Sequence, residues 1–297
     1  MSNYPNFLIV GVARCGTTSL FHYLKQHPEI GMSKIKEPKY FSSIDLYLPQ
    51  TGVGDGTVFS KLVTSEMNYD ELFDGLESFK AIGEGSSDCF YYHKMVIPRI
   101  KEKLGDVKII VCLRNPIERA FSAYNNLVRD SREYLSFSDG LAEEQNRIVN
   151  NWDWMWHYKN GGLYAEALEH YQKEFTNVKV VFFEDLESKP HEVLNELFVF
   201  LGVKSKISID VDTRYSHSGK PKSKIVSLLT SRKNPIIFMM REIALKFIPR
   251  KYLEKAASKM FVKDTILSDD KKQLQSFFKK DILKLETLLN RDLKSWL

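Results

Sequence analysis

Short, continuous apolar runs recur along the chain and alternate with segments of helical periodicity. Residues 7–12 (FLIVGV) are such a run, typical of a strand buried on both faces of a sheet, and 108–114 (KIIVCLR), with an apolar run between its two cations, form the clearest strand. Residues 178–186 (VKVVFFEDL) show the same pattern, and 81–84 form a weaker fourth run. The pattern therefore predicts four short strands inside one sheet.

The segments between these runs have apolar residues at helical spacing. We expect helices over 17–27, over 93–104, from Pro116 onward and over 190–201, with more helix after residue 224. This alternation predicts an α/β fold with a central parallel sheet flanked by helices. Ligands of such folds bind at the carboxyl ends of the strands, so the residues that follow the two clearest strands should form the site.

Size and composition favour one domain. With 297 residues, 43% of them hydrophobic, the chain can bury a large core, and no Gly/Ser-rich or Pro-rich linker divides it. Charge is uneven: residues 213–297 have 20 Lys or Arg against 8 Asp or Glu, whereas residues 1–212 have 23 against 30. We therefore expect a single domain over 1–297 with a basic C-terminal region that faces an anionic ligand or surface.

The cysteines and the N-terminal sequence indicate the cellular compartment. Cys15, Cys89 and Cys112 are an odd number and lie far apart, which favours reduced thiols over a disulfide framework. The N-terminus lacks the pattern of a signal segment, and no run of about 18 apolar residues is present to span a membrane. We therefore predict a cytoplasmic protein. The basic region lacks a recognised nucleic-acid motif, so we expect no nucleic-acid partner.

Glycines and hydroxyl residues follow the first strand in GVARCGTTSL, residues 11–20. Gly11 and Gly16 allow a tight turn whose N–H groups point at an anion, and the next helix adds its positive end. The alternative is an ordinary strand-to-helix turn. The loop lacks the lysine of the GxxxxGK[ST] pattern, which argues against ATP or GTP hydrolysis of that type. Its one cation, Arg14, lies earlier in the turn.

The second strand end reads CLRNPIERAFSAY, residues 112–124. Arg114 suits bidentate phosphate recognition, and Ser122, eight residues on, can complete a cradle. In the alternative interpretation, Arg114 and Arg119 pair with Glu118 or other surface acids.

Taken together, three motifs resemble the sulfotransferase family, in its bacterial and heparan-sulfate-type branch. They are GVARCGTTSL, KEPKYFSS at 36–43 and IIVCLRNPIERAFSAY at 109–124, in this order. The resemblance continues through NGGLYAEALEHYQKEF, VVFFEDLESKPHEVLNELFVFLGV and the terminal LETLLNRDLKSWL. It thus spans nearly the whole chain.

The resemblance implies 3′-phosphoadenosine 5′-phosphosulfate (PAPS) as donor, bound at two separated anion sites. Arg14 stands where the family has an active-site lysine, and Arg114 and Ser122 match its 3′-phosphate contacts. The polar loop 214–224 (RYSHSGKPKSK) is similar to the loop that closes over the donor, and region 213–297 would form part of the cleft. The implied donor-binding residues are Arg14, Cys15, Gly16, Thr17, Thr18, Ser19, Arg114, Ser122, Tyr164, Lys220 and Lys222.

The resemblance also assigns the chemistry. Glu37 stands where related enzymes have the catalytic base, and a carboxylate can take the proton of an attacking hydroxyl; the alternative is a solvated loop acid. Arg14 is always protonated, so it can stabilise charge on the leaving oxygen but is a poor general acid. From the residues themselves, we expect Lys36 and Lys39 to hold an anionic acceptor or a phosphate, and Glu84 and Ser86 to line the acceptor side of the cleft; the alternative for each is loop or turn structure.

For two further segments, the sequence is compatible with two interpretations. The aromatic segment 151–164 (NWDWMWHYKNGGLY) fits core packing better than stacking on sugars or lipids, and the basic segment 233–261 fits a helical lid better than a membrane-surface helix. No His/Cys/Asp cluster has ligand spacing, so we predict no metal.

The sequence therefore predicts a PAPS-dependent sulfotransferase that acts on a hydroxyl, or with less support an amine, of a carbohydrate, glycolipid or small metabolite. One alternative is a nucleotide-dependent kinase or other phosphotransferase, which the missing lysine disfavours. Another is a non-catalytic protein that binds anions or membranes on the same fold.

Overall fold

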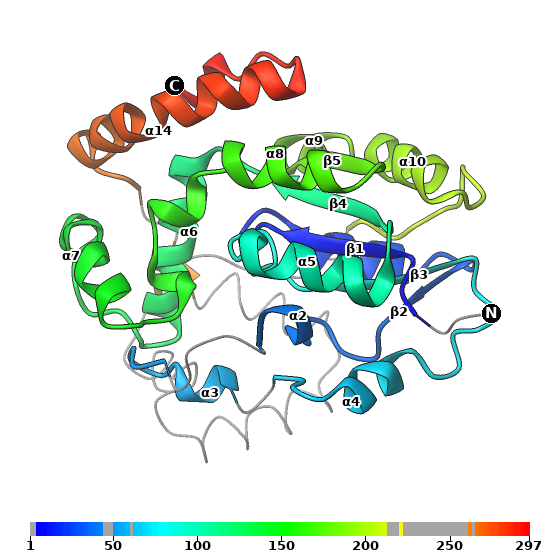
Figure 1. Ribbon diagram of the computed structural model, residues 1–297. Helices are drawn as coiled ribbons and strands as arrows, with labels where there is room; N and C mark the ends of the chain where they lie inside the picture. Colours follow the sequence, from blue (N-terminus) through cyan, green and yellow to red (C-terminus); the bar gives the residue numbers. More distant parts are fainter. Residues whose placement is uncertain (1–3, 44–49, 60–61, 213–219, 222–260, 263–264) are drawn as a thin grey trace. The chain divides into compact units, whose positions relative to one another are not determined.

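The computed structural model describes residues 4–43, 50–59, 62–212, 220–221, 261–262 and 265–297 (Figure 1). The chain divides into two compact units. The sheet unit consists of Met1–Leu46, Lys61–Arg114 and Tyr164–Tyr215. The helical unit consists of Tyr47–Ser60, Asn115–Leu163 and Ser216–Leu297.

A five-stranded parallel sheet forms the centre of the sheet unit. The strand order is β2-β3-β1-β4-β5, so β1 lies between β3 and β4, and Leu8 of β1 pairs with Glu84 on one side and Ile109 on the other. The carboxyl ends of the three central strands therefore meet at one edge. The strands are β1 (Phe7–Gly11), β2 (Ile30–Met32), β3 (Ala81–Gly85), β4 (Lys108–Leu113) and β5 (Val178–Phe182).

Helices of the sheet unit connect and cover these strands (Figure 1). Helix α1 contacts β1 and β2, α5 packs against α8, and α10 packs against α9 and β5. The bounds are α1 (Thr17–Leu24), α2 (Tyr40–Ser43), α4 (Glu66–Asp70), η1 (Glu71–Phe73), α5 (His93–Leu104), α8 (Ala165–Glu174), α9 (Phe183–Ser188) and α10 (Pro190–Leu201).

The core of this unit lies around β1, whose five residues are all buried. The Phe7 ring packs over Gly83 of β3, where a Cβ atom would come within 2.0 Å of it. Glycine at this position therefore lets an aromatic ring fill the space beside the neighbouring strand.

The helical unit is built on α6, α7 and α14. Its aromatic core includes Trp154, Trp156 and Tyr158, each at most 2% exposed, which confirms the core interpretation of that aromatic segment. The elements are α3 (Gly56–Phe59), α6 (Pro116–Arg129), α7 (Phe137–Val149), η2 (Trp154–Trp156), η3 (Asn160–Gly162), β6 (Lys220–Pro221), β7 (Phe261–Val262), α14 (Ser268–Leu289) and η4 (Lys294–Trp296).

The structure confirms the predicted α/β class with a parallel sheet, and it corrects several details. Residues 183–186 belong to α9 instead of extending the last strand, and α1 ends at Leu24, three residues earlier than predicted. Strand β2 was not predicted because three residues carry too little periodicity. Among the described residues, no helix is long and apolar enough to cross a membrane.

Candidate active site at the carboxyl edge of the sheet

The loop between β1 and α1 has the features of an anion-binding turn. Gly16 caps α1 with φ 87° and offers no side-chain acceptor to the first-turn N–H groups. The first turn has no acidic residue and instead carries the hydroxyls of Thr17, Thr18 and Ser19. These N–H groups, hydroxyls and the helix dipole suit an anionic ligand.

The backbone of this loop is held from several sides. Val12 N–H donates to the Cys112 carbonyl of β4 at 2.8 Å, and Cys15 N–H donates to the Val12 carbonyl at 3.1 Å. Arg14 has φ 73°, a left-handed conformation that a residue with a Cβ atom adopts at a cost of about 1–3 kcal/mol. The Arg14 side chain is half-buried. The surrounding contacts therefore fix a conformation that the local sequence does not favour.

Cys15 and Tyr164 lie behind the loop. Both are at most 1% exposed, and the Tyr164 hydroxyl lies 3.9 Å from Cys15 Sγ. The same hydroxyl donates to the Arg114 carbonyl at 3.1 Å. Tyr164 thus joins the loop to the end of β4, whatever further contact it makes with a ligand.

Arg114 lies next to the β1–α1 loop within the sheet unit. Its guanidinium carbon lies 4.5 Å from the centroid of the Phe183 ring, and its Nη1 lies 3.4 Å from the Arg14 carbonyl oxygen. Ser122, by contrast, is buried on α6 in the helical unit. Arg119 is also fully buried, so the interpretation of this arginine as a surface residue was wrong.

Glu37 lies in the loop after β2 and is held by the segment after β3. One carboxylate oxygen accepts from Ser87 N–H at 2.9 Å, and the other accepts from Ser87 Oγ at 2.8 Å and from Lys36 Nζ. Glu37 N–H donates to the Gly85 carbonyl at 2.9 Å, with φ 61° at Glu37. Its side chain is 28% exposed. Hydrogen bonds thus hold both the backbone and the carboxylate of Glu37, while the side chain still reaches solvent.

The electrostatic surroundings keep this carboxylate ionised. Burial raises the pKa of Glu37, but the charges of Lys36 and Lys39 and the hydrogen bonds from Lys36 and Ser87 outweigh it, so the pKa lies below its ordinary value. The two lysine side chains are only 15% and 14% exposed, so they are not solvated loop charges. Lys39, with φ 55°, lies 4.0 Å from Asp88.

Glu84 and Ser86 lie deeper, at 1% and 2% exposure. Glu84 accepts from the Tyr69 hydroxyl at 3.2 Å, and Ser86 Oγ accepts from Lys39 N–H at 3.0 Å. Burial raises the pKa of Glu84 to about 7; the Ser86 hydrogen bond opposes this rise, and the charges of Glu37 and Asp88 add to it. The hydrogen bonds of Glu84 and Ser86 are those expected if the two residues stabilise the turn after β3, which was the alternative interpretation of both.

The sheet brings the anion loop and the carboxylate to one edge. Ser86 N–H donates to Ile9 O at 3.2 Å, and Phe90 N–H donates to Val10 O at 2.7 Å, so the segment after β3 runs along the end of β1. The site thus combines a helix N-terminus, two arginines and a half-buried carboxylate. That set can bind an anionic group and remove a proton close to it.

Some predicted residues lie outside this description. The Lys220 side chain, Lys222 and most of segment 214–224 are outside the described residues, as is nearly all of 233–261. Sequence reasoning missed Phe183 and Asp88, which contact Arg114 and Lys39. The signal that could have found Asp88 is its position just after β3, in the same turn as Ser86 and Ser87.

Comparison with known proteins yields one family. The sulfotransferase domain matches residues 4–282. The membrane-associated sulfotransferase kil1 of Dictyostelium discoideum is 32% identical over 151 residues, which are 49% of this chain and 29% of kil1. Heparan sulfate glucosamine 3-O-sulfotransferase 3B1 of Homo sapiens is 25% identical over 206 residues, 69% of this chain and 47% of that protein. The chain spans less than half of the length of either relative.

A solved structure is similar over the full length. The crystal structure of a sulfotransferase from Alicyclobacillus acidocaldarius has a TM-score of 0.79 and 33% identity, and the match covers 99% of this chain and 98% of that one. This agreement supports the fold.

Proposed function

The chain belongs to the sulfotransferase domain family, and on that premise we propose that it transfers a sulfuryl group from PAPS to a hydroxyl of a carbohydrate-containing acceptor. The observation that carries the proposal is the pairing of an anion loop with an ionised, anchored Glu37 at one edge of the sheet. PAPS supplies the sulfuryl group and a phosphate leaving group.

The residues around the β1–α1 loop fit the phosphosulfate end of such a donor. First-turn N–H groups and hydroxyls of α1 would bind its 5′ oxygens. Arg14 would hold negative charge on the oxygen that leaves sulfur, because a guanidinium stays protonated throughout. Arg114 and Ser122 would hold the 3′-phosphate, and Cys15, Tyr164, Lys220 and Lys222 would complete the donor site.

Glu37 would act as the general base. As the acceptor oxygen bonds to sulfur, its proton passes to the Glu37 carboxylate, and the bond between sulfur and the nucleotide's phosphate oxygen breaks. The products are a sulfate ester and 3′-phosphoadenosine 5′-phosphate. Ser87 orients the carboxylate through two hydrogen bonds, so the base is held for this step without a rearrangement.

The acceptor class rests on the relatives and on charge. One relative's name specifies heparan sulfate glucosamine, an anionic polysaccharide unit. Lys36 and Lys39 border Glu37 and supply positive charge where an anionic sugar chain would approach. We propose that they bind the acceptor, whereas Glu84 and Ser86 support the loop that carries them.

The donor is tested by thermal shift with 3′-phosphoadenosine 5′-phosphate, 5′-AMP and ATP. We expect the first nucleotide to stabilise the protein most, and Arg114→Ala to remove that advantage while Lys173→Ala, an exposed cation on α8, keeps it. Equal shifts for the first two nucleotides would contradict the 3′-phosphate assignment. Stabilisation by ATP alone would favour the phosphotransferase alternative.

The transfer itself is tested with radiolabelled donor and a panel of glycans, glycolipids and small alcohols and amines. We expect label in a glycan. Binding of 3′-phosphoadenosine 5′-phosphate without transfer to any acceptor class would support a non-catalytic binding protein instead.

A further inference from the structure

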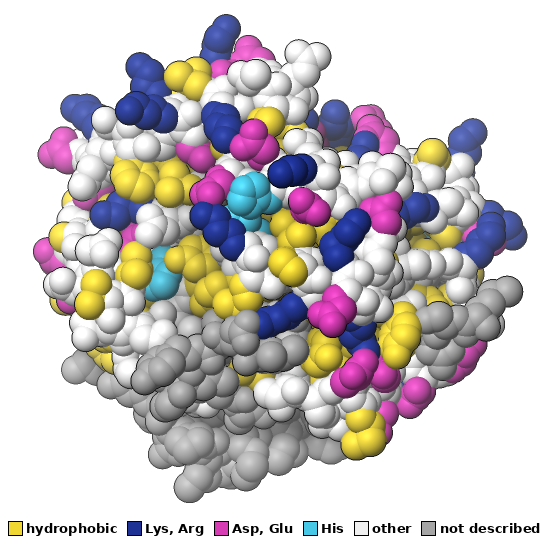
Figure 2. All heavy atoms as spheres, viewed as in Figure 1, with side chains coloured by type: hydrophobic (Ala, Val, Ile, Leu, Met, Phe, Trp, Pro, Cys, Tyr) yellow, Lys and Arg dark blue, Asp and Glu magenta, His cyan; other side chains and the backbone are white. Residues whose placement is uncertain are grey.

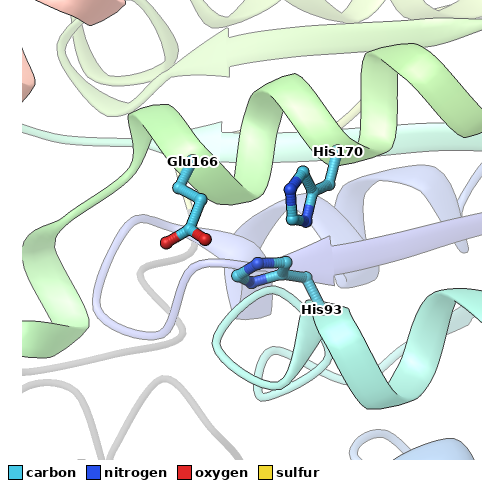
Figure 3. A group of neighbouring side chains, drawn as sticks. All are labelled: His93, Glu166 and His170. Atoms are coloured by element: carbon cyan, nitrogen blue, oxygen red, sulfur yellow. The ribbon is translucent and has the colours of Figure 1, made fainter.

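Three potential metal ligands meet between α5 and α8, and none of them is a residue assigned to transfer. They are His93, Glu166 and His170, and Figure 3 shows their side chains pointing toward one another. Glu166 and His170 are four residues apart on α8 and therefore share one face of that helix. One ligand atom from each residue lies within 4.8 Å of those of the other two.

His93 is the residue that ordinary packing does not explain. It is 8% exposed, and neither ring nitrogen makes a hydrogen bond of acceptable geometry, although the Phe90 carbonyl lies close to the ring. Buried polar groups without partners cost free energy and are uncommon in native proteins. The His170 ring lies edge-on at 4.8 Å between centroids, so a second imidazole faces the first.

We propose that His93, Glu166 and His170 bind a divalent transition metal, with Zn²⁺ as the best fit. Two imidazoles and one carboxylate are borderline ligands that suit Zn²⁺ better than Mg²⁺ or Ca²⁺. Three protein ligands leave one position for water.

The ligands must close slightly around the ion. With bonds of about 2.0–2.1 Å, ligand atoms of a tetrahedral zinc site lie about 3.4 Å apart. Glu166 is exposed and pairs with exposed Lys94 at 2.7 Å, and surface pairs of this kind contribute little stability. Figure 2 shows histidine side chains among acidic and basic ones on one face of the molecule. Within the cluster, Glu166 is exposed and His170 is half-buried, so an ion has access from solvent.

Metal at this position would fix the start of α5 to α8. Helix α5 begins directly after the segment that carries Ser87, the partner of Glu37. The Tyr171 hydroxyl already donates to Cys89 O in that segment at 3.0 Å. The metal would therefore add to an existing connection between α8 and the segment, as a structural ion.

The test uses untagged, chelator-treated protein titrated with ZnSO₄ by calorimetry and thermal shift. We expect one Zn²⁺ per chain and, at about 100 times Kd, a rise in Tm of about 4 °C or more. His170→Ala and Glu166→Gln should each weaken binding at least tenfold. His191→Ala, which removes an exposed histidine on α10, should not. Mg²⁺ should give no shift.

A second measurement keeps the proposal testable if a variant folds poorly. Co²⁺ bound to the wild-type chain should give visible d–d absorption typical of low coordination number, and Zn²⁺ should displace it. Absence of stoichiometric Zn²⁺ binding, or equal binding by wild type, His170→Ala and Glu166→Gln, would overturn the site.

Discussion

Charged side chains gather in both units, but they are held in different ways. In the helical unit, Asp55 is fully buried and pairs with Arg132, and it also accepts from Trp156 Nε1 at 3.1 Å. Glu133 pairs with Arg147 at 2.7 Å, again with both side chains nearly inaccessible. In the sheet unit, Glu37 is 28% exposed, and its backbone adopts φ 61°.

This difference separates a structural charge from a reactive one. Both partners of each buried pair are nearly inaccessible from solvent, so these charges are out of reach of a ligand and serve packing. In the sheet unit, Arg14, Glu37 and Lys39 keep partial solvent access, and their backbone is held in left-handed conformations that cost about 1–3 kcal/mol each. Left-handed backbone also occurs at Ser131 and Asn151 of the helical unit, so it is the combination with a partly exposed charged side chain that distinguishes the sheet-unit positions.

The largest expected effect is on catalysis. Glu37→Gln should lower kcat by about 10²–10⁴, because the base is lost while the side chain keeps an acceptor for Ser87. Thermal unfolding should change little. Turnover is measured with labelled donor, with Glu192→Gln on α10 as the matched exposed control. Unchanged turnover in Glu37→Gln would remove it as the base.

The next largest effect is on stability, and it concerns the buried ion pair of the helical unit. Asp55→Ala should cost about 3–5 kcal/mol of unfolding free energy, because it leaves the buried Arg132 charge unpaired. Adding Arg132→Met should recover part of that loss, which denaturant titrations of the single and double variants would measure. If Asp55→Ala lost activity with no loss of stability, the structural assignment of this pair would fail.

A third experiment addresses Glu84, which is buried like Asp55 but lies beside Glu37. Its folded-state pKa of about 7 exceeds its ordinary value of 4.5, so between these pH values the folded state holds a proton that the unfolded state has lost. Stability from this group is therefore present below about pH 4.5 and is lost as pH rises to 7.

We accordingly expect Glu84→Gln to stabilise the protein at pH 8 by on the order of 2 kcal/mol and to have little effect at pH 4.5. Urea unfolding at both pH values measures this, with Glu192→Gln as control. An equal change at both pH values would show that ionisation of Glu84 is not the cause.

The smallest expected effect is on the pH dependence of catalysis. Lys36 lowers the pKa of Glu37, so Lys36→Met should move the acid limb of the kcat/KM profile to higher pH, because the base must be ionised. At alkaline pH and saturating acceptor, kcat of the variant should approach that of wild type, whereas KM for the acceptor should rise because Lys36 also binds it. A limb that stays in place would mean that another group sets it.

Much of the fold could be predicted from the sequence. Residues 109–113 are continuously apolar and 190–201 carry Pro190 at the first turn, so both elements were found with nearly correct bounds. Residues 183–186 looked like more strand because FEDL follows VKVVF without a break, and only the packing of α9 decides otherwise. The metal-ligand cluster could not be predicted, since His93 lies 73 residues before Glu166 and the fold alone brings them together.

Within the site, residue types were predicted better than their surroundings. The motifs pointed to Arg14, Glu37 and Arg114, but the sequence does not show that Lys36 and Lys39 are mostly buried. Nor does it show which group holds Glu37, because Ser87 is 50 residues away along the chain. The pKa of a carboxylate depends on such distant neighbours, so it follows from the fold and not from the motif.

The three cysteines offer a built-in reporter of opening in the sheet unit. Cys15 lies in the β1–α1 loop, Cys89 in the segment after β3 and Cys112 in β4, and all three are buried residues outside any disulfide. Burial raises the pKa values of the Cys89 and Cys112 thiols, so both stay protonated and unreactive while the unit is closed. Their rates of alkylation would therefore measure how often each part of the site opens, with no label introduced by mutation.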